Sequence, residues 1–457
     1  MSQTITIPYT TFRGSSSSHH ATLRVPGNAD GTPCPVVVNV HGGFWKTKWS
    51  LQNLDTSTLL GAFAGCATWD VEYTRVDQAD PPASPEGGGF PHSCLDVLAA
   101  VNALADGTVP PALRAQLDLT RVYLCGHSAG GHIALWLAMV SRLRPDKRSE
   151  LATALDAAVG AEAAQALRAG VSPGVLIRGA IGLAPVTCLT DALADGLSDY
   201  HDAAVNFLWR AGASAGAGDG ATAAPWLACA CPCMLLGSLL ADEASGAAGT
   251  AGTAGTAATD TDTVAATAAA GDAPAPPPPL RLLLLSGLSD EDVPATQSVT
   301  LAAAAWSASA PASSTAAPAA AAAAAAARVS VQLALVEGAD HYEVAGLCDT
   351  ATPGAPAERW EAMAAALGAF VREAEDDDDE APAPAALAKL CVASEAEARA
   401  LCAKARPHIC AARSVAALQE KGAADAAAAA PADAELARGL RRWFAWNGTT
   451  PPEGVLL

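Results

Sequence analysis

The sequence has few aromatic residues and a shortage of positive charge. Only 5% of its 457 residues are Phe, Trp or Tyr, and 27 Lys and Arg stand against 47 Asp and Glu. The resulting net charge of −20 argues against nucleic acid or an anionic membrane as the main partner, because both attract basic proteins. Alanine inflates the hydrophobic content of 51%, so that figure overstates the apolar core.

Long apolar runs and a dense cysteine pattern are also missing. The Ala-rich run at 320–327 is too short and too weakly apolar to span a membrane. Residues 1–7 lack the basic and then apolar layout of a secretory signal, so we expect a cytoplasmic protein. Twelve cysteines are too sparse for a disulfide scaffold in a chain of this length. Cys229, Cys231 and Cys233 do not follow the usual C-x-x-C spacing of metal sites, and we expect no metal and no cofactor.

Strand and helix patterns alternate along the first 240 residues. They predict βαβ units and a parallel sheet, after an antiparallel hairpin formed by two strands with no helix between them. The predicted strands cover 3–11, 21–25, 36–41, 68–73, 122–126, 175–183, 280–287 and 328–336. The predicted helices cover 51–65, 94–105, 132–143, 150–169 and, as a terminal amphipathic helix, 358–373.

Segments of biased composition interrupt and follow this pattern. Residues 244–279 are rich in Ala, Thr, Gly, Asp and Pro, and we expect a disordered insertion because this composition cannot bury a core. Residues 308–327 form an Ala-rich segment. An acidic run follows, and we interpret 376–457 as an acidic linker and a partly helical C-terminal tail. The predicted folded domain therefore covers residues 1–375.

The segment 121–132 carries the most informative motif of the chain. An apolar strand pattern runs into Gly-His-Ser-Ala-Gly at 126–130, and an amphipathic helix pattern follows at once. This order is that of a nucleophile elbow, a turn so tight that only small residues fit beside the serine. The helix N-terminus beneath the serine favours developing negative charge. We predict that Ser128 is a catalytic nucleophile; the alternative is an ordinary turn between a strand and a helix.

A serine nucleophile requires a base, and a carboxylate that orients the base. His341 follows the strand at 328–336 after a glycine turn, at the end where open α/β sheets place their sites, and we predict it as the base. The carboxylate should follow the preceding strand, where Asp290 and Asp292 both occur. We favour Asp290, although a small error of register would exchange the two. The chain order of Ser128, Asp290 and His341 is that of α/β-hydrolases.

A glycine pair after the third predicted strand fits an oxyanion hole. The run His-Gly-Gly-Phe-Trp covers residues 41–45, and its glycines allow backbone N–H groups to turn toward one point. We predict that Gly42 and Gly43 join Ala129 as donors. His41 is expected to hold this loop in shape rather than to transfer protons.

Two further groups beside this loop have mainly structural interpretations. Glu72 and Arg75 are expected to form an ion pair that braces the oxyanion loop. Phe44 and Trp45 are candidate substrate-binding residues, and packing over the loop is an equal alternative for Trp45.

Several of these motifs together resemble one family. The runs H-G-G-F-W at 41–45, D-V-E-Y-T-R-V at 70–76, G-G-G-F-P at 87–91 and G-H-S-A-G-G-H at 126–132 are similar to signatures of kynurenine formamidase-like and BD-FAE-type esterases of the α/β-hydrolase superfamily. The acid segment 287–294 and the histidine segment 338–341 resemble theirs as well. The chain departs from the family at Ser286, where His is usual, and at Thr74, where Arg is usual.

The resemblance implies an α/β-hydrolase fold with a mostly parallel eight-stranded sheet and helices on both faces, to which this chain adds the insertion and the C-terminal extension. It implies a serine hydrolase that cleaves a small-molecule carboxylic ester or amide through an acyl-enzyme, without metal or cofactor. An arylformamidase acting on N-formylkynurenine is the narrower alternative. A non-catalytic binding protein on the same fold is the second alternative, against which the complete set of Ser128, Asp290 and His341 argues. The oligomeric state is left open.

Overall fold

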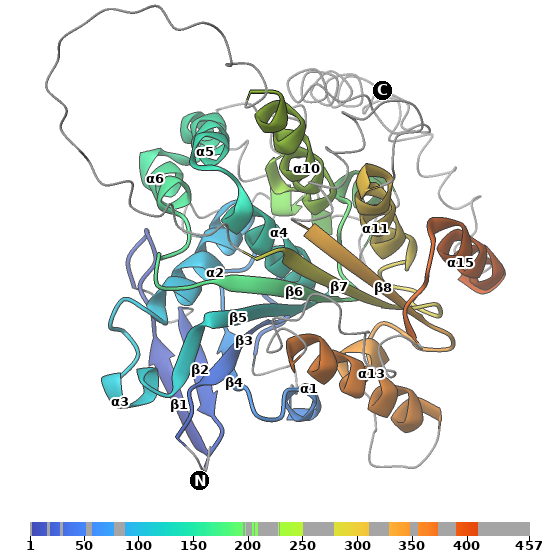
Figure 1. Ribbon diagram of the computed structural model, residues 1–457, viewed down its shortest axis with the longest axis horizontal. Coiled ribbons are helices and arrows are strands. Elements are labelled where there is room, and N and C mark those ends of the chain that lie inside the picture. Colours follow the sequence, from blue (N-terminus) through green and yellow to red (C-terminus); the bar gives the residue numbers. More distant parts are fainter. Residues whose placement is uncertain are drawn as a thin grey trace, which may run out of the picture.

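A single eight-stranded sheet runs through the part of the chain that the computed structural model describes (Figure 1). The described residues are 2–15, 19–27, 31–51, 57–76, 87–194, 197, 203–204, 206–208, 227, 229–249, 278–309, 329–347, 355–372 and 390–409. The strands are β1 (Gln3–Pro8), β2 (His20–Val25), β3 (Cys34–Val40), β4 (Ala67–Val71), β5 (Leu117–His127), β6 (Ile177–Leu183), β7 (Leu280–Gly287) and β8 (Val329–Val336).

The strand order is β1-β2-β4-β3-β5-β6-β7-β8. Strand β2 lies antiparallel to β1 and to β4, and all the other neighbours are parallel. This topology confirms the predicted α/β-hydrolase fold, including the N-terminal hairpin. Strand β5 begins five residues before the predicted start at 122, because its first part alternates buried Leu117 and Leu119 with more exposed Asp118 and Thr120. An apolar run alone does not reveal such a half-buried segment.

Helices cover both faces of the sheet (Figure 1). They are α1 (Ser57–Ala62), α2 (His92–Ala103), α3 (Pro111–Arg114), α4 (Ala129–Arg142), α5 (Pro145–Val159), α6 (Ala161–Ala169), α7 (Leu189–Ala194), α10 (Pro232–Gly249), α11 (Thr296–Ser309), α13 (Ala355–Arg372) and α15 (Glu395–Ile409). The single helix predicted at 150–169 is divided into α5 and α6 at Gly160, whose φ of 87° no helical residue adopts.

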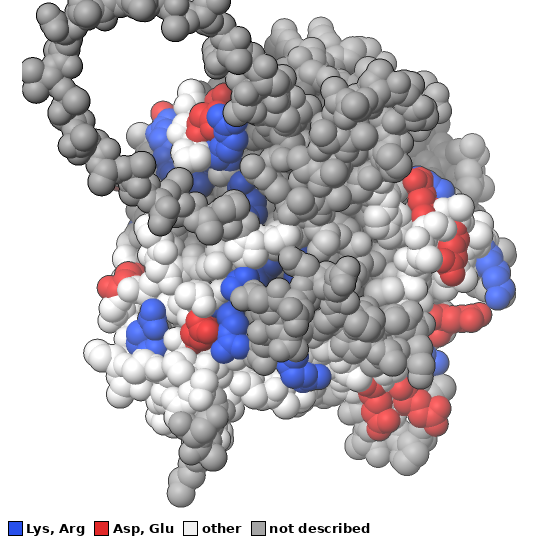
Figure 2. All heavy atoms as spheres, viewed as in Figure 1, with Lys and Arg blue, Asp and Glu red and all other residues white. Residues whose placement is uncertain are grey.

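Two apolar clusters lie between the sheet and its helices. The smaller cluster joins α1 and α13 to one face of the sheet, and the larger one joins α2, α4, α10 and α11 to the other. Every residue of β3 is buried as a result, which explains why its sequence is nearly all apolar rather than alternating. Figure 2 shows that the surface in the same view carries both signs of charge, with acidic side chains gathered over α13.

The chain beyond residue 375 returns to the sheet. The N–H of Val392 donates to the carbonyl of Leu333 in β8 at 2.8 Å, and Cys391 forms an antiparallel bridge with Ala334. Val392, Ala398 and Cys402 are buried in the larger apolar cluster, so α15 packs on the same body as the sheet. A domain boundary at 375 does not anticipate this packing, because among the side chains described in 390–404 only Val392, Ala398 and Cys402 are buried.

Parts of the predicted low-complexity segments lie outside the described residues: 250–277 of the insertion, 310–327 of the Ala-rich segment, the acidic run and 410–457 of the tail. Helix α10 continues to Gly249, five residues past the predicted start of the insertion at 244. Among the helices that are described, none is both long enough and apolar enough to cross a membrane.

Candidate active site

Ser128 occupies the turn between β5 and α4 in a backbone conformation that residues other than glycine rarely adopt. Its φ is 55° and its ψ is −119°, and its N–H donates to the carbonyl of Leu183 at 2.8 Å. A Cβ added to Gly126 would lie 2.2 Å from the carbonyl oxygen of Gly130, and a Cβ on Gly130 would lie 2.1 Å from that of Val40. The elbow therefore has room only for glycine at these two positions, and the turn holds strain of the kind found at functional sites.

His341 meets Asp290 at the carboxyl ends of β7 and β8. The imidazole Nδ1 lies 2.8 Å from Oδ2 of Asp290, and both side chains are buried. The other oxygen, Oδ1, accepts the backbone N–H groups of Asp292 at 2.9 Å and Val293 at 2.8 Å. An Nδ1–H that donates to the carboxylate leaves Nε2 as the acceptor. Of the two candidate acids, the structure brings Asp290 to Nδ1, whereas Asp292 contributes its main chain.

The same acids and histidine are close enough to raise the question of a metal ion. Ligand atoms of Asp290, Asp292 and His341 all lie within 4.8 Å of one another. However, both oxygens of Asp290 accept N–H groups, and Nδ1 of His341 is occupied by the bond to Asp290. These hydrogen bonds are those of an acid that orients a histidine.

Ser128 is the next residue after His127, whose ring contacts the His341 loop. The residue is only 1% exposed, and Oγ has no hydrogen-bond partner among the described residues. A buried hydroxyl without a partner is costly in a purely structural role. The position is one that a functional contact explains.

His127 was missed by the sequence analysis because it fills a variable position of the motif. Its Nε2 lies 2.9 Å from the carbonyl oxygen of His341, and the two rings are 4.5 Å apart. Burial, and then the nearby charge of His341, lower the pKa of His127 well below its usual value. A neutral His127 donates Nε2–H to that carbonyl, which ties the His341 loop to the elbow. Its place next to Ser128 in the G-H-S-A-G-G-H run was the signal in the sequence.

The glycine loop after β3 lies against this elbow. A Cβ added to Gly42 would lie 3.1 Å from Cβ of Ser128 and 2.8 Å from the carbonyl oxygen of His127. Gly43 has φ 107°, and a Cβ there would lie 2.4 Å from Cβ of Trp49. Ala129 is the first residue of α4 and is buried. The structure thus places Gly42 against the serine and Ala129 directly after it, whereas the atoms nearest to Gly43 belong to Trp49.

Buried charge braces the glycine loop. Nε2 of His41 lies 3.0 Å from Oε1 of Glu72, and Arg75 contacts the same oxygen at 3.3 Å, which confirms the predicted ion pair. The N–H of Leu51 donates to Oε2 of Glu72 at 3.0 Å, and the Tyr73 ring stacks on His41 at 4.5 Å. Burial alone would raise the pKa of Glu72, but the hydrogen bond and charge of His41 and the charge of Arg75 outweigh it and lower that pKa.

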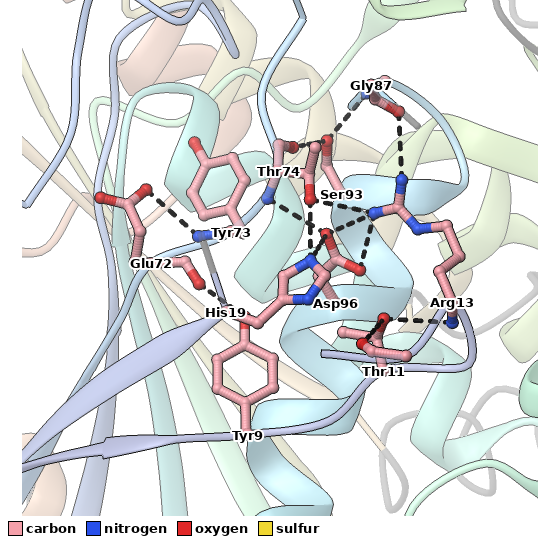
Figure 3. Close-up of polar contacts among 12 residues, drawn as sticks. Tyr9, Thr11, Arg13, His19, Glu72, Tyr73, Thr74, Gly87, Ser93 and Asp96 are labelled. Carbon is pink, nitrogen blue, oxygen red and sulfur yellow. Dashed lines mark hydrogen bonds and ion pairs between the residues drawn. The ribbon is translucent and has the colours of Figure 1, made fainter. Parts of the chain in front are cut away.

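A second buried carboxylate fixes the segment that follows Glu72 (Figure 3). Nη2 of Arg13 contacts both oxygens of Asp96 at 3.0 and 2.8 Å, and the Thr74 N–H donates to Oδ2 at 3.1 Å. His19 Nε2 lies 2.9 Å from the hydroxyl of Thr74 and 3.4 Å from Asp96. Burial would raise the pKa of Asp96, but the hydrogen bond from His19 and the charge of Arg13 outweigh it and lower that pKa. Thr74, which departs from the family pattern, is a member of this network.

The two predicted substrate-binding residues differ in exposure. Trp45 is 1% exposed, stacks on Phe207 at 4.3 Å and meets the edge of His132 at 5.2 Å. This environment agrees with the packing alternative for Trp45. Phe44 is half-buried, and both residues have positive φ.

Helix α4 also holds the chain that leads into α10. Nε2 of His132 lies 2.9 Å from the carbonyl oxygen of Ala230, and Trp136 Nε1 donates to that of Cys229 at 2.8 Å. Burial lowers the pKa of His132 to about 4. The contacts and the lowered pKa of His132 fit a structural residue.

Comparison with known proteins agrees with the motifs. Residues 23–166 match the BD-FAE family model, a span that holds the glycine loop and the elbow but ends before Asp290 and His341. No curated protein sequence matches the chain. This match confirms the resemblance to BD-FAE-type proteins, whereas the narrower likeness to kynurenine formamidases stays a prediction.

Similar solved structures include three esterases. Inhibited esterase B from Lactobacillus rhamnosis has 16% identity and a TM-score of 0.48, covering 82% of this chain and 90% of that one. Carboxyl esterase 2 from the mycorrhizal fungus Tuber melanosporum has 15% identity and a TM-score of 0.45, with coverage of 80% and 87%. An esterase of Pyrobaculum calidifontis has 14% identity and a TM-score of 0.43, with coverage of 82% and 85%.

Proposed function

From the premise that the chain is an α/β-hydrolase with a BD-FAE match over residues 23–166, we propose that it is a serine hydrolase. Its substrate is a small carboxylic ester or amide, and the reaction passes through an acyl-enzyme. The observation that carries the proposal is the 2.8 Å contact between His341 and Asp290, together with a buried Ser128 hydroxyl at the elbow that has no hydrogen-bond partner among the described residues.

In this mechanism Asp290 holds the proton of His341 on Nδ1, so that Nε2 takes the proton of Ser128 as the serine attacks the acyl carbon. The N–H groups of Gly42, Gly43 and Ala129 stabilise the oxyanion that develops. His341 then returns the proton to the leaving group. A water molecule then attacks the acyl carbon while His341 takes its proton. His341 returns that proton to Ser128 as the acyl group leaves.

The test is covalent labelling by a fluorophosphonate together with hydrolysis of p-nitrophenyl esters. We expect stoichiometric labelling on Ser128, and loss of both labelling and turnover in Ser128→Ala. Ser141→Ala is the matched control, because Ser141 lies on the same helix α4 and its hydroxyl donates only to the carbonyl of Ala138. The proposal would be overturned if Ser128→Ala is still labelled, or if the folded native chain hydrolyses none of the esters.

Substrate preference separates this proposal from the arylformamidase alternative. N-formylkynurenine and other aryl formamides are compared with acyl esters of increasing length by their kcat/KM. A preference for the formyl amides over all esters identifies the narrower activity. A preference for esters leaves the chain an esterase.

A further inference from the structure

Three cysteine side chains meet at the start of α10, and the proposed hydrolysis does not use them. Cys188 lies after β6, Cys231 directly precedes α10, and Cys233 lies in its first turn. The N–H of Leu189 donates to Sγ of Cys231 at 3.4 Å, and that Sγ lies 3.6 Å from the carbonyl oxygen of Thr187. The N–H of Cys233 donates to the same carbonyl at 3.1 Å. Both chain neighbours of Cys188 therefore contact one of the other two cysteines.

The three thiols lie close enough to shift one another's pKa values. Cys188 and Cys231 are buried, whereas Cys233 is partly exposed. The neighbouring Cys231 raises the pKa of Cys188 to about 11. Burial would raise the pKa of Cys231, but the other two thiols and hydrogen bonds from the N–H groups of Leu189 and Met234 outweigh it and lower that pKa. The thiolate, which is the reactive form, is thus favoured at Cys231.

The surrounding structure holds this cluster in place before any bond forms. His132 and Trp136 fix the two residues before Cys231 to α4. On the other side, the N–H of Cys188 donates to Oε1 of Gln297 at 2.7 Å. Little conformational freedom remains to be lost when two of the sulfurs are joined.

We propose that Cys188 and Cys231 form a reversible disulfide site that responds to peroxide. The thiolate of Cys231 attacks one oxygen of hydrogen peroxide, and the O–O bond breaks. Hydroxide is the leaving group, and Cys231 becomes a sulfenic acid. The thiol of Cys188 then attacks that sulfur, and the sulfenic oxygen leaves as water with the thiol proton. The two sulfurs together lose two electrons, and the peroxide is reduced to water. A dithiol reductant restores both thiols by exchange.

Cys188 is the partner because it comes from a different segment. Cys231 and Cys233 are two residues apart, and a disulfide between them would have to close a very small ring. A bond from Cys188 instead joins the segment after β6 to the start of α10. The first of these segments also contacts the nucleophile, since the N–H of Val186 donates to the carbonyl of Ser128 at 3.3 Å.

The experiment uses the full chain, reduced and then treated with hydrogen peroxide. Free thiols are alkylated after denaturation, and the peptides are identified by mass spectrometry with and without a dithiol. We expect two of the twelve cysteines to be lost from the alkylated set and to appear as one Cys188–Cys231 peptide pair. The cross-link should raise Tm by roughly 5 °C, and the reductant should reverse the rise.

Two variants make the assignment specific. Cys188→Ser should give no disulfide and should leave a sulfenic acid on Cys231 that dimedone traps. Cys94→Ser is the matched control, because burial and the charge of Asp96 raise the pKa of Cys94, and it should form the same disulfide as the native chain. The proposal is overturned if the native chain yields no disulfide, or one that joins other cysteines. Because these measurements do not depend on hydrolysis, a failure here is distinct from a failure of the proposed function.

Discussion

Replacement of Asp290 by Asn changes only the group that faces Nδ1 of His341. The remaining carbonyl oxygen of Asn can still accept the N–H groups of Asp292 and Val293, which bind Oδ1 in the native chain. The amide NH₂ then takes the place of Oδ2, 2.8 Å from Nδ1. Two N–H groups cannot hydrogen-bond, so the histidine moves its proton to Nε2 and accepts at Nδ1. A protonated Nε2 cannot take the proton of Ser128.

The expected loss is about 10⁴-fold in kcat, which corresponds to about 5.5 kcal/mol of transition-state free energy. KM should change little, because Asp290 is 0% exposed and cannot touch the substrate. The unfolding temperature should stay close to that of the native chain, since the two backbone bonds persist.

Asp292→Asn is the matched control. Asp292 is bound to Asp290 through its backbone N–H, which the substitution leaves in place. Its kcat should stay within about threefold of the native value. Both variants are compared by p-nitrophenyl ester hydrolysis and by the rate of fluorophosphonate labelling. A larger loss in Asp292→Asn than in Asp290→Asn would refute the assignment of the acid.

Three further outcomes follow from the same structure. Gly42→Ala should lower kcat by about 10²–10³-fold, because the added Cβ would press on the elbow. Gly61→Ala is the control, since its Cβ would have nothing within 4 Å, and it should leave kcat unchanged. A fully active Gly42→Ala would contradict the placement of the oxyanion loop. Glu72→Gln should lower the unfolding free energy at neutral pH by about 2–3 kcal/mol, measured by urea titration. Because folding lowers the pKa of Glu72, this stabilisation is present above the unfolded pKa and is lost as the pH falls through the folded value, so the two proteins should converge in acid and not in base. Chains 1–375 and 1–409 should both keep kcat/KM within a few-fold of the full chain. Only the shorter chain should lose several degrees of Tm, because it lacks the buried side chains of α15. Equal Tm values would show that α15 adds no stability.

Most of the fold could be predicted from local sequence patterns. Buried parallel strands must be nearly continuous apolar runs, and such runs mark β3 and β7. The elbow was equally readable, because a strand, two glycines around a serine and a helix follow one another within local sequence. The residue types of the site were also readable, since each follows the end of a recognisable strand.

Which groups touch depends on how the segments pack. The sequence favours Asp290 over Asp292 only by its register, and the turn after β7 directs Oδ2 of Asp290 toward His341. The roles of His127, and of Asp96 with its partners Arg13 and His19, depend on contacts between segments far apart in the chain. No local periodicity encodes such contacts.

Composition was least informative for the C-terminal part. The described side chains that dock this part, Val392, Ala398 and Cys402, are few and small, and such a sparse set did not predict the packing. The contact of Cys188 with Cys231 and Cys233 was equally unpredictable. Cys188 lies more than 40 residues before the other two, and the three show no ligand spacing. Local sequence fixes the conformation and burial of each segment, whereas the partners of its polar groups depend on how the segments pack together.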